Sequence, residues 1–401
     1  MIRVLVLLIA AMGTAGATGP ASPAADFTLS TSCPPGFEKT KSGVCELRTL
    51  YQFYDSLENR GLGGTRTGLP PHRDGFTPQQ IDLGRYLFFD PVLSGDGTLS
   101  CASCHDPALG LSDGRPRSIG IHGEDAGRAA PTLWNVAFLK RFFWDARAAS
   151  LESQASGPLY SAREMGNTPA QLLASLNGNA NYRRLFQEAF PSDRGPITEQ
   201  RIFTALAAFQ TSLVSLNSRY DRYVHGYQAA LSDREIEGLN VFRSFVARCS
   251  ECHTPPLFTN EQIAVIGMPE PEGRPFDAGA EAILHSPKLK GGFKVPTLRN
   301  IARTAPYSHS GAFSDLREVV EFYNKGRGNA VSEDMHLYLH WHISDPKLTD
   351  TEVERIVDFL GTLTDETFLP QRPARVPSGH VVSSKAAKAL STWPTHRGES
   401  G

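Results

Sequence analysis

The sequence repeats one five-residue pattern, as Cys101-Ala-Ser-Cys104-His105 and as Cys249-Ser-Glu-Cys252-His253. Both copies read C-x-x-C-H, which is typical of covalent haem attachment. The two thiols of each copy would form thioethers with the haem vinyl groups, and the adjacent imidazole would lie beneath the iron as its proximal ligand. A redox-active dithiol does not require the histidine, and a zinc site would require the two pairs to converge. The pattern therefore predicts two covalently attached haem c groups.

The composition fits a globular chain that is long enough for two domains. Of its 401 residues, 40% are hydrophobic and 20% are charged, which excludes global disorder. The 40 Lys and Arg residues nearly balance the 42 Asp and Glu residues, so the formal net charge is −2. Because such a chain offers no basic field to a polyanion, we expect no nucleic-acid partner.

The first residues are typical of a secretory signal rather than of folded structure. Arg3 precedes an apolar run over residues 4–12, and the small residues Ala15-Gly16-Ala17 follow as a cleavage site. The run is shorter than the roughly 18 residues that cross a bilayer, and no later stretch reaches that length. We therefore predict a signal peptide over residues 1–17 and an exported protein, which in a bacterium means the periplasm. The alternative is an N-terminal anchor helix.

Two further cysteines lie in the predicted N-terminal extension, residues 18–74. Cys33 and Cys45 flank a short loop that is rich in Gly, Pro and Lys. In an oxidising compartment a disulfide that closes this loop is the expected arrangement. Free thiols or metal ligands are the alternative, and the absence of a nearby histidine in the sequence argues against it.

The sequence around the two motifs is duplicated. A helix is predicted before each motif, over residues 77–89 and 232–242. Thr77 would cap the first helix with Pro78 in its first turn, and Ser232 with Glu235 would form a capping box on the second. A second repeat follows the motifs, as Ala130-Pro-Thr-Leu-Trp-Asn135 and Val295-Pro-Thr-Leu-Arg-Asn300. Two related domains in tandem explain this pattern best.

Few segments alternate as strands do, so the predicted fold class is mainly α. Apolar residues at helical spacing predict further helices over residues 168–176, 198–216, 316–323 and 349–363. Residues 62–71 and 268–279 are rich in Gly and Pro and are predicted loops. We expect two tandem cytochrome c-like domains, residues 75–230 and 231–366, each with one covalently bound haem. The tail from 367 to 401 is predicted to be disordered.

From Gly75 to Leu363 the chain resembles the bacterial di-haem cytochrome c peroxidases and their MauG-like relatives. The resemblance rests on five segments: Leu87-Phe-Phe-Asp-Pro-Val-Leu-Ser94, Ala130-Pro-Thr-Leu-Trp-Asn135, Phe143-Trp-Asp-Ala-Arg147, Val295-Pro-Thr-Leu-Arg-Asn300 and Thr304-Ala-Pro-Tyr-Ser-His-Ser-Gly311. It implies that the haem of the N-terminal domain, with His105 as proximal ligand, reacts with hydrogen peroxide. It also implies that the haem of the C-terminal domain, with His253, is six-coordinate and passes electrons.

The resemblance also implies catalytic residues beside the first haem. Splitting the O–O bond of peroxide requires a proton to move from the near oxygen to the leaving one. Family members carry a glutamine and a glutamate at the spacing of Gln154 and Glu164, which makes Glu164 the acid/base catalyst and Gln154 its hydrogen-bonding partner. Trp144 would relay electrons between the haems. By residue type alone, Glu164 could equally lie on a surface helix and Trp144 could pack in the core.

The sixth ligand of the second haem departs from the peroxidase pattern. Peroxidases of the family use a methionine in the helix after the Pro-Tyr-x-His segment, whereas the alignment of residues 318–324 places Tyr323 there, as in MauG. A phenolate stabilises oxidised iron, whereas a thioether raises the haem potential. The alternative is that Tyr323 packs in the core and that Met268 or Met335 is the ligand.

Two further sites follow from the resemblance. His122 lies in a loop near the position of a histidine that blocks the first iron of resting peroxidases, and the alternative is a solvent-exposed loop histidine. Family members also hold a calcium ion between the haems. Thr304 and Pro306 match part of its shell, but the usual asparagine is Ala129 here, so water or another donor would be needed.

These features together predict a periplasmic MauG-like enzyme. It would use hydrogen peroxide to form high-valent haem iron and would oxidise a Trp or Tyr side chain of a partner protein. Within this branch, MauG acts on a quinone cofactor precursor and MbnH on a partner from a copper-linked operon. One alternative is a di-haem cytochrome c peroxidase that takes electrons from a small cytochrome c or cupredoxin. Another is a non-catalytic di-haem electron carrier, in which Gln154 and Glu164 would have no use.

Overall fold

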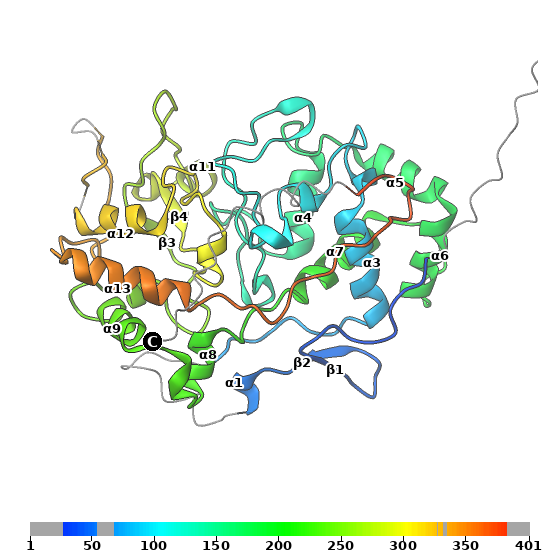
Figure 1. The fold of residues 1–401 in the computed structure, drawn as a ribbon. Coiled ribbons are helices and arrows are strands. Elements are labelled where there is room, and N and C mark those ends of the chain that lie inside the picture. The colour runs from blue at the N-terminus through cyan, green and yellow to red at the C-terminus, as the bar shows by residue number, and fades with distance from the viewer. Residues whose placement is uncertain (1–26, 54–67, 327, 332–334, 383–401) are drawn as a thin grey trace, which may run out of the picture.

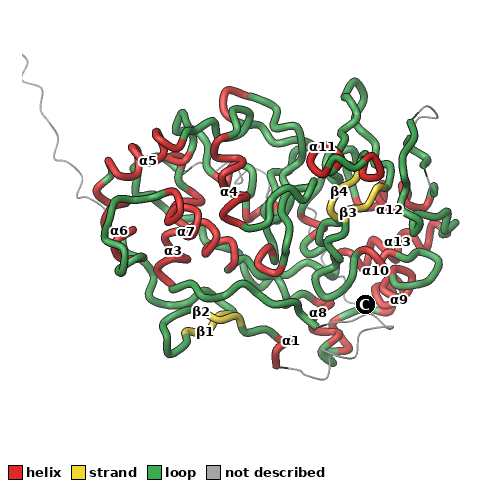
Figure 2. Tube along the Cα trace, turned by 180° about the vertical axis from the view of Figure 1, so that it is seen from behind, coloured by secondary structure: helices red, strands yellow, loops and turns green. Residues whose placement is uncertain are grey.

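The computed structural model describes residues 27–53, 68–326, 328–331 and 335–382. The predicted signal peptide and part of the predicted loop at 62–71 lie outside these residues. The described chain is mainly helical with two short two-stranded antiparallel sheets, which confirms the predicted fold class. Figure 2 shows the helices gathered in two groups that long loops connect. None of the described helices is long and apolar enough to cross a membrane.

The helices divide between the two halves of the chain. Those of the N-terminal half are α3 (Pro78–Phe89), α4 (Leu151–Tyr160), α5 (Pro169–Gly178), α6 (Ala180–Ala189) and α7 (Glu199–Thr211). Those of the C-terminal half are α8 (Arg219–Val224), α9 (Asp233–Phe242), α10 (Cys249–Cys252), α11 (Glu281–Leu284), α12 (Leu316–Asn324) and α13 (Asp350–Gly361). In the C-terminal half, β3 (Ile263–Val265) pairs antiparallel with β4 (Gly292–Lys294).

The helix starts follow the local sequence. Thr77 caps α3 and forms a capping box with Gln80, and Ser232 forms the predicted box with Glu235 at the start of α9. The six predicted helices are all present, but α7 ends at Thr211 rather than near residue 216. It ends early because the chain turns to bring the backbone N–H of Ser215 to the side-chain oxygen of Asn135, at 2.8 Å.

The duplication extends from sequence to packing. Helix α3 packs against α7, and α9 packs against α13 in the same way. A glycine lies at each crossing: a Cβ on Gly84 would lie 1.8 Å from the carbonyl oxygen of Ala205, and one on Gly238 would lie 1.8 Å from that of Arg355. Each pair therefore depends on a position where any side chain would force the helices apart.

Two hydrophobic cores correspond to the two helix groups. In the first, Leu83 of α3 and Ile202 of α7 are fully buried. In the second, Leu239 of α9 packs with Phe359 of α13 and with Phe258, which lies between the helices. Each C-x-x-C-H motif follows the first helix of its own pair, so each core supports one motif.

The N-terminal extension joins both halves. Strand β1 (Phe37–Lys39) pairs antiparallel with β2 (Cys45–Leu47), and a disulfide links Cys33 to Cys45 as predicted. The short helix α1 (Leu50–Phe53) then brings Tyr51 to the C-terminal half, where its hydroxyl donates to Asp221 at 2.7 Å. The same carboxylate accepts a hydrogen bond from the fully buried Arg299, at 2.6 Å. The extension is thus part of the second core.

The C-terminal segment differs from the prediction. We expected disorder from residue 367, whereas residues 367–382 run from α13 back along the N-terminal half (Figure 1). Arg372 donates to Asp106 at 2.9 Å, Ser378 donates to Asp90 at 2.6 Å, and Val376 is buried in the first core. The amino-acid composition did not predict an ordered segment. The contacting residues Arg372, Val376 and Ser378 are single residues among Pro and Gly, so they create no periodic pattern. Residues 383–401 lie outside the described part.

The helix crossings generate a stability prediction. Gly238→Ala should lower the free energy of unfolding by about 1–3 kcal/mol, because the new methyl group overlaps the carbonyl of Arg355 unless α9 and α13 separate. Denaturant unfolding of the haem-loaded protein measures this change. Gly361→Ala is the control, since a Cβ there would meet nothing within 4 Å. Equal losses for both variants would contradict the packing.

Candidate active site

The first motif presents His105 to a cavity in a defined orientation. Cys101 begins a short 3-10 turn, and the ring Nδ1–H of His105 donates to the carbonyl oxygen of Leu111 at 2.9 Å. Burial lowers the pKa of His105 below its usual value, so the ring is neutral. Because Nδ1 carries the proton, Nε2 keeps its lone pair. This is the form of imidazole that binds iron.

The second motif is built in the same way. Helix α10 contains Cys249 and Cys252, and Nδ1 of His253 lies 3.2 Å from the carbonyl oxygens of both Phe258 and Pro296. Burial lowers the pKa of His253 to about 4. Its Nε2 is therefore also available as a ligand.

The repeated Pro-Thr-Leu segments hold the loops that orient these histidines. The hydroxyl of Thr132 donates to the carbonyl of Gly110 at 2.7 Å, directly before Leu111. The hydroxyl of Thr297 donates to the carbonyl of Leu257 at 2.6 Å, directly before Phe258. The second sequence repeat therefore has a structural purpose, which is to fix the carbonyls that accept from the imidazoles.

The two repeated segments are both hydrogen-bonded to Ser215. Asn135 and Asn300 end them with positive φ angles of 62° and 58°. The side-chain amide of Asn135 donates to the carbonyl of Ser215 at 3.0 Å, and that of Asn300 donates to the Ser215 hydroxyl at 2.8 Å. One serine thus fixes the position of both segments, and with them both histidines.

The first cavity brings together the residues predicted for peroxide chemistry. Its wall includes Cys101, Cys104 and His105, and also Trp144, Gln154 and Glu164. Gln154 comes from α4, and Glu164 comes from the loop that follows this helix. Burial raises the pKa of Glu164 although Arg147 and Arg163 lie close enough to oppose the shift. A carboxyl group with a raised pKa can both accept and return a proton near neutral pH.

Trp144 lies in the wall that separates the two cavities and lines both. Its indole N–H donates to the carbonyl oxygen of Ala129 at 2.8 Å. On the side of the second cavity it meets the ring of His309 edge-on, with 6.4 Å between the ring centroids. The predicted relay residue therefore occupies the space between the two motifs.

The second cavity contains two candidates for the distal iron ligand. Its wall includes Cys249, Cys252, His253 and Tyr323, which is supplied by α12. Burial, reinforced by the Cys252 and Cys249 thiols, raises the pKa of the Tyr323 phenol. The phenol would therefore ionise only beside a positive charge such as an iron ion. Met268 also lines this cavity, whereas Met335 is not among its described lining residues.

Of the remaining predicted residues, Thr304 and Pro306 line a cavity and His122 does not. His122 has a side chain that is 69% exposed, points its Nδ1 toward Asp96 at 4.0 Å and does not line the first cavity. Thr304 and Pro306 line the second cavity, where the Thr304 hydroxyl donates to the carbonyl of Ile301 at 3.1 Å. The Ala129 carbonyl next to the predicted calcium position is already bonded to Trp144.

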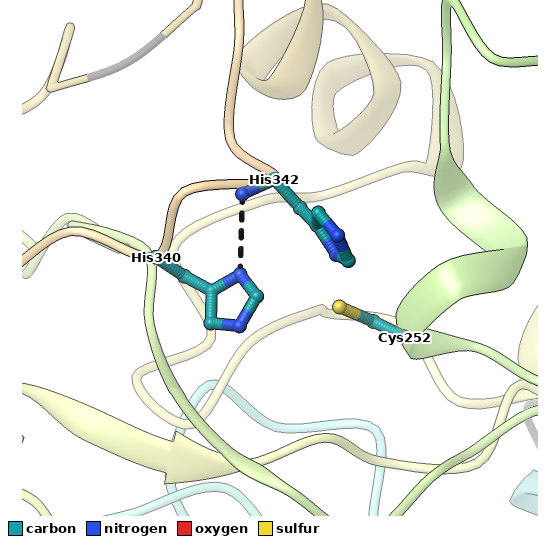
Figure 3. Close-up of side chains that lie close together, drawn as sticks. All are labelled: Cys252, His340 and His342. Carbon is teal, nitrogen blue, oxygen red and sulfur yellow. Dashed lines mark hydrogen bonds between the residues drawn. The ribbon is translucent and has the colours of Figure 1, made fainter.

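Sequence analysis missed one cluster. The ligand atoms of Cys252, His340 and His342 all lie within 4.8 Å of one another, as Figure 3 shows. The backbone N–H of His342 donates to Nδ1 of His340 at 3.3 Å. A thioether to haem would use the Cys252 sulfur, so we interpret the cluster as the edge of the second cavity, whose wall includes Cys252 and His342. Residues 341 and 342 form a turn, closed by the hydrogen bond from the Ile343 N–H to the His340 carbonyl at 3.0 Å, so no periodic pattern in the sequence signals this cluster.

The residues of both cavities fit a haem. Each wall offers two thiols, one neutral imidazole with a free Nε2 and largely apolar surroundings. These four cysteines are not disulfide-bonded, although Cys33 and Cys45 are. The helical fold and the paired cavities define a two-domain haem oxidoreductase.

Comparison with known proteins agrees with this class. The family model for di-haem cytochrome c peroxidase matches residues 78–229. The chain is 34% identical to the methylamine utilization protein MauG of Methylorubrum extorquens over 306 residues, 76% of this chain and 84% of the relative. It is also 34% identical to cytochrome c551 peroxidase of Nitrosomonas europaea over 294 residues, 72% and 82% of the two chains.

Solved structures give the same result. A MauG-like protein associated with microbial copper homeostasis superposes with a TM-score of 0.68 and 32% identity, covering 77% of this chain and 97% of that one. The di-haem peroxidase BthA of Burkholderia thailandensis gives 0.63 and 27%, covering 79% and 98%. The chain belongs to the di-haem cytochrome c peroxidase and MauG family. It is an oxidoreductase with two haem cofactors.

Proposed function

We propose that this protein is a periplasmic MauG-like enzyme that uses hydrogen peroxide to oxidise a Trp or Tyr side chain of a partner protein. The observation that supports this most is the Tyr323 phenol in the second cavity. A phenolate ligand favours oxidised iron, so that haem would accept electrons poorly from ordinary cytochromes and would hold oxidising equivalents well. Such a haem suits the oxidation of a side chain.

The first cavity provides the groups for peroxide cleavage. A haem bound there through Cys101, Cys104 and His105 would supply the electrons that reduce the O–O bond. Glu164, in its carboxylate form, would take the proton from the near oxygen and return it to the leaving oxygen as water forms. The Gln154 amide would donate a hydrogen bond that orients the peroxide.

Trp144 connects the two cavities and would pass electrons between them. Its indole N–H is held by the Ala129 carbonyl, so the ring stays fixed in the wall. The oxidising equivalents could then be shared with the second cavity, where Cys249, Cys252 and His253 would hold the other haem. Electrons from the partner would restore the resting state.

The periplasmic location and the covalent attachment are part of the same proposal. The signal-like residues 1–17 and the Cys33–Cys45 disulfide both suit an oxidising compartment. Attachment through the four motif cysteines follows from the C-x-x-C-H pattern. A calcium ion near Thr304 and Pro306 would rely on carbonyl and water ligands, because Ala129 has no side-chain oxygen.

One observation favours a second function. Met268 lines the second cavity, as Tyr323 does, and a thioether ligand would raise the potential of that haem. The protein would then be a di-haem cytochrome c peroxidase that accepts electrons from a small cytochrome c or cupredoxin.

The proposed function can be tested with hydrogen peroxide and two kinds of donor. We expect peroxide to modify Trp or Tyr residues in a protein encoded beside this gene, as detected by peptide mass spectrometry. We expect reduced cytochrome c to be consumed slowly. Rapid cytochrome c oxidation without any modification of a neighbouring gene product would favour the peroxidase.

Replacing Glu164 tests the proton-transfer role. Glu164→Gln should slow the reaction with peroxide about 10²–10⁴-fold, because the amide cannot accept the proton. In stopped-flow measurements the wild-type rate should fall as the pH drops through the raised pKa of Glu164, and the variant should lack this dependence.

The stability of the same variant separates function from folding. Burial raises the pKa of Glu164, so its charge destabilises the fold at pH values above that pKa, and Gln should not lower the melting temperature. Glu124→Gln, at an exposed position, is the control. A variant that reacts with peroxide at the wild-type rate would remove Glu164 from the mechanism.

The sixth ligand can be identified from spectra of the ferric protein. Tyr323→Phe should convert the second haem from low spin to high spin, since a phenyl ring cannot coordinate iron. Met268→Leu should leave the spectrum unchanged. The reverse result would assign Met268 as the ligand and support the peroxidase.

A further inference from the structure

A buried lysine lies in the wall between the two cavities. Lys294 ends strand β4, is 9% exposed and lines both cavities together with Trp144. Its backbone N–H donates to the carbonyl oxygen of Trp144 at 2.7 Å. Strand pairing with Ile263 fixes it further. Its side chain is therefore held where both haem positions are near.

The ammonium of Lys294 has no counter-ion on the described part of the chain. No carboxylate lies within the 4.0 Å of an ion pair, and Glu261 is the acid that acts on it from farther away. The Glu261 carboxylate instead accepts the backbone N–H of Lys140 at 2.7 Å. An unpaired ammonium in such a place is costly, and burial lowers the pKa of Lys294 accordingly.

Neighbouring cations are neutralised within the protein. Arg128 lies 2.6 Å from Asp145 and 2.7 Å from Asp277, and Arg147 lies 2.8 Å from Asp145. Arg141 of the same wall also lacks an ion pair on the described part of the chain, but it is exposed, so Lys294 is the buried cation of this wall without a counter-ion. We therefore look for its counter-ion on the haems that would occupy the two cavities. The anionic groups of a haem are its two propionates.

We propose that the Lys294 ammonium binds a haem propionate and acts as the internal counter-ion of the haem pair. A fixed positive charge near the iron favours the reduced form, so Lys294 raises the reduction potential of the haem whose propionate it binds. The same contact places a charge beside Trp144. This inference requires the two haems of the family but neither peroxide nor a partner protein.

The test is a potentiometric titration of the haem-loaded protein. Lys294→Met keeps the length of the side chain and removes its charge. The reduction equilibrium of one haem should shift about tenfold toward the oxidised form, which lowers a one-electron potential by ~59 mV. The spectrum of the shifted haem shows whether the propionate belongs to the high-spin or the low-spin centre.

Matched variants separate this role from a general loss of charge or fold. Lys288→Met removes an exposed charge from the same segment and should shift neither potential. Lys294→Arg should keep most of the wild-type potential. Lys294→Gln provides the neutral measurement where the methionine variant does not retain both haems.

Two results would overturn the proposal. One is unchanged potentials for both haems in the neutral variants of Lys294. The other is a Glu261→Gln variant that lowers the reduction potential of the same haem as much as Lys294→Met does. That result would show that Lys294 and Glu261 act as a pair and that the propionate is not the partner. Both readouts are independent of turnover, so a failure of the proposed function would not affect them.

Discussion

The hydrogen bond from each motif imidazole to a backbone carbonyl is the interaction on which the rest of the site depends. It selects the neutral tautomer and directs Nε2 of His105 and His253 into the cavities. The cysteines alone could not do this, because a C-x-x-C-H segment leaves the ring free to rotate. The accepting carbonyls are held in turn by Thr132 and Thr297. A change in either loop would therefore act directly on the imidazole that we propose as iron ligand.

The two halves share the elements that orient the motif histidine, and they differ in the residues that line the cavity. Both contain a helix pair with a glycine at the crossing, a motif and a Pro-Thr-Leu segment. The differences lie in the cavity walls, where α4 and its following loop add Gln154 and Glu164 to the first, and α12 adds Tyr323 to the second. The proposed division into a peroxide-reacting centre and an oxidant-storing centre follows from these few side chains. Duplication supplied the scaffold, and local substitutions supplied the chemistry.

Sequence patterns predicted the parts of the structure that local rules control. Helix capping by Thr77 and Ser232 depends on residues three positions away, and haem attachment depends on the five residues of each C-x-x-C-H motif. Both can therefore be predicted from a short stretch of sequence. The anchoring of residues 367–382, by contrast, depends on partners such as Asp90 and Asp106 that are far away in sequence. The burial of Lys294 also could not be predicted from the sequence, because the residues that flank a buried lysine in a strand do not differ from those that flank an exposed one. Such features require the tertiary structure.

The C-terminal segment has a consequence for how the two halves depend on each other. Val376 completes the hydrophobic core of the first half, and Arg372 reaches the carboxylate next to His105. Both residues follow the last helix of the second half in the sequence. In the opposite direction, Tyr51 precedes the helices of the first half and is buried in the second core. A cut in the chain between α7 and α8 would therefore leave both cores incomplete.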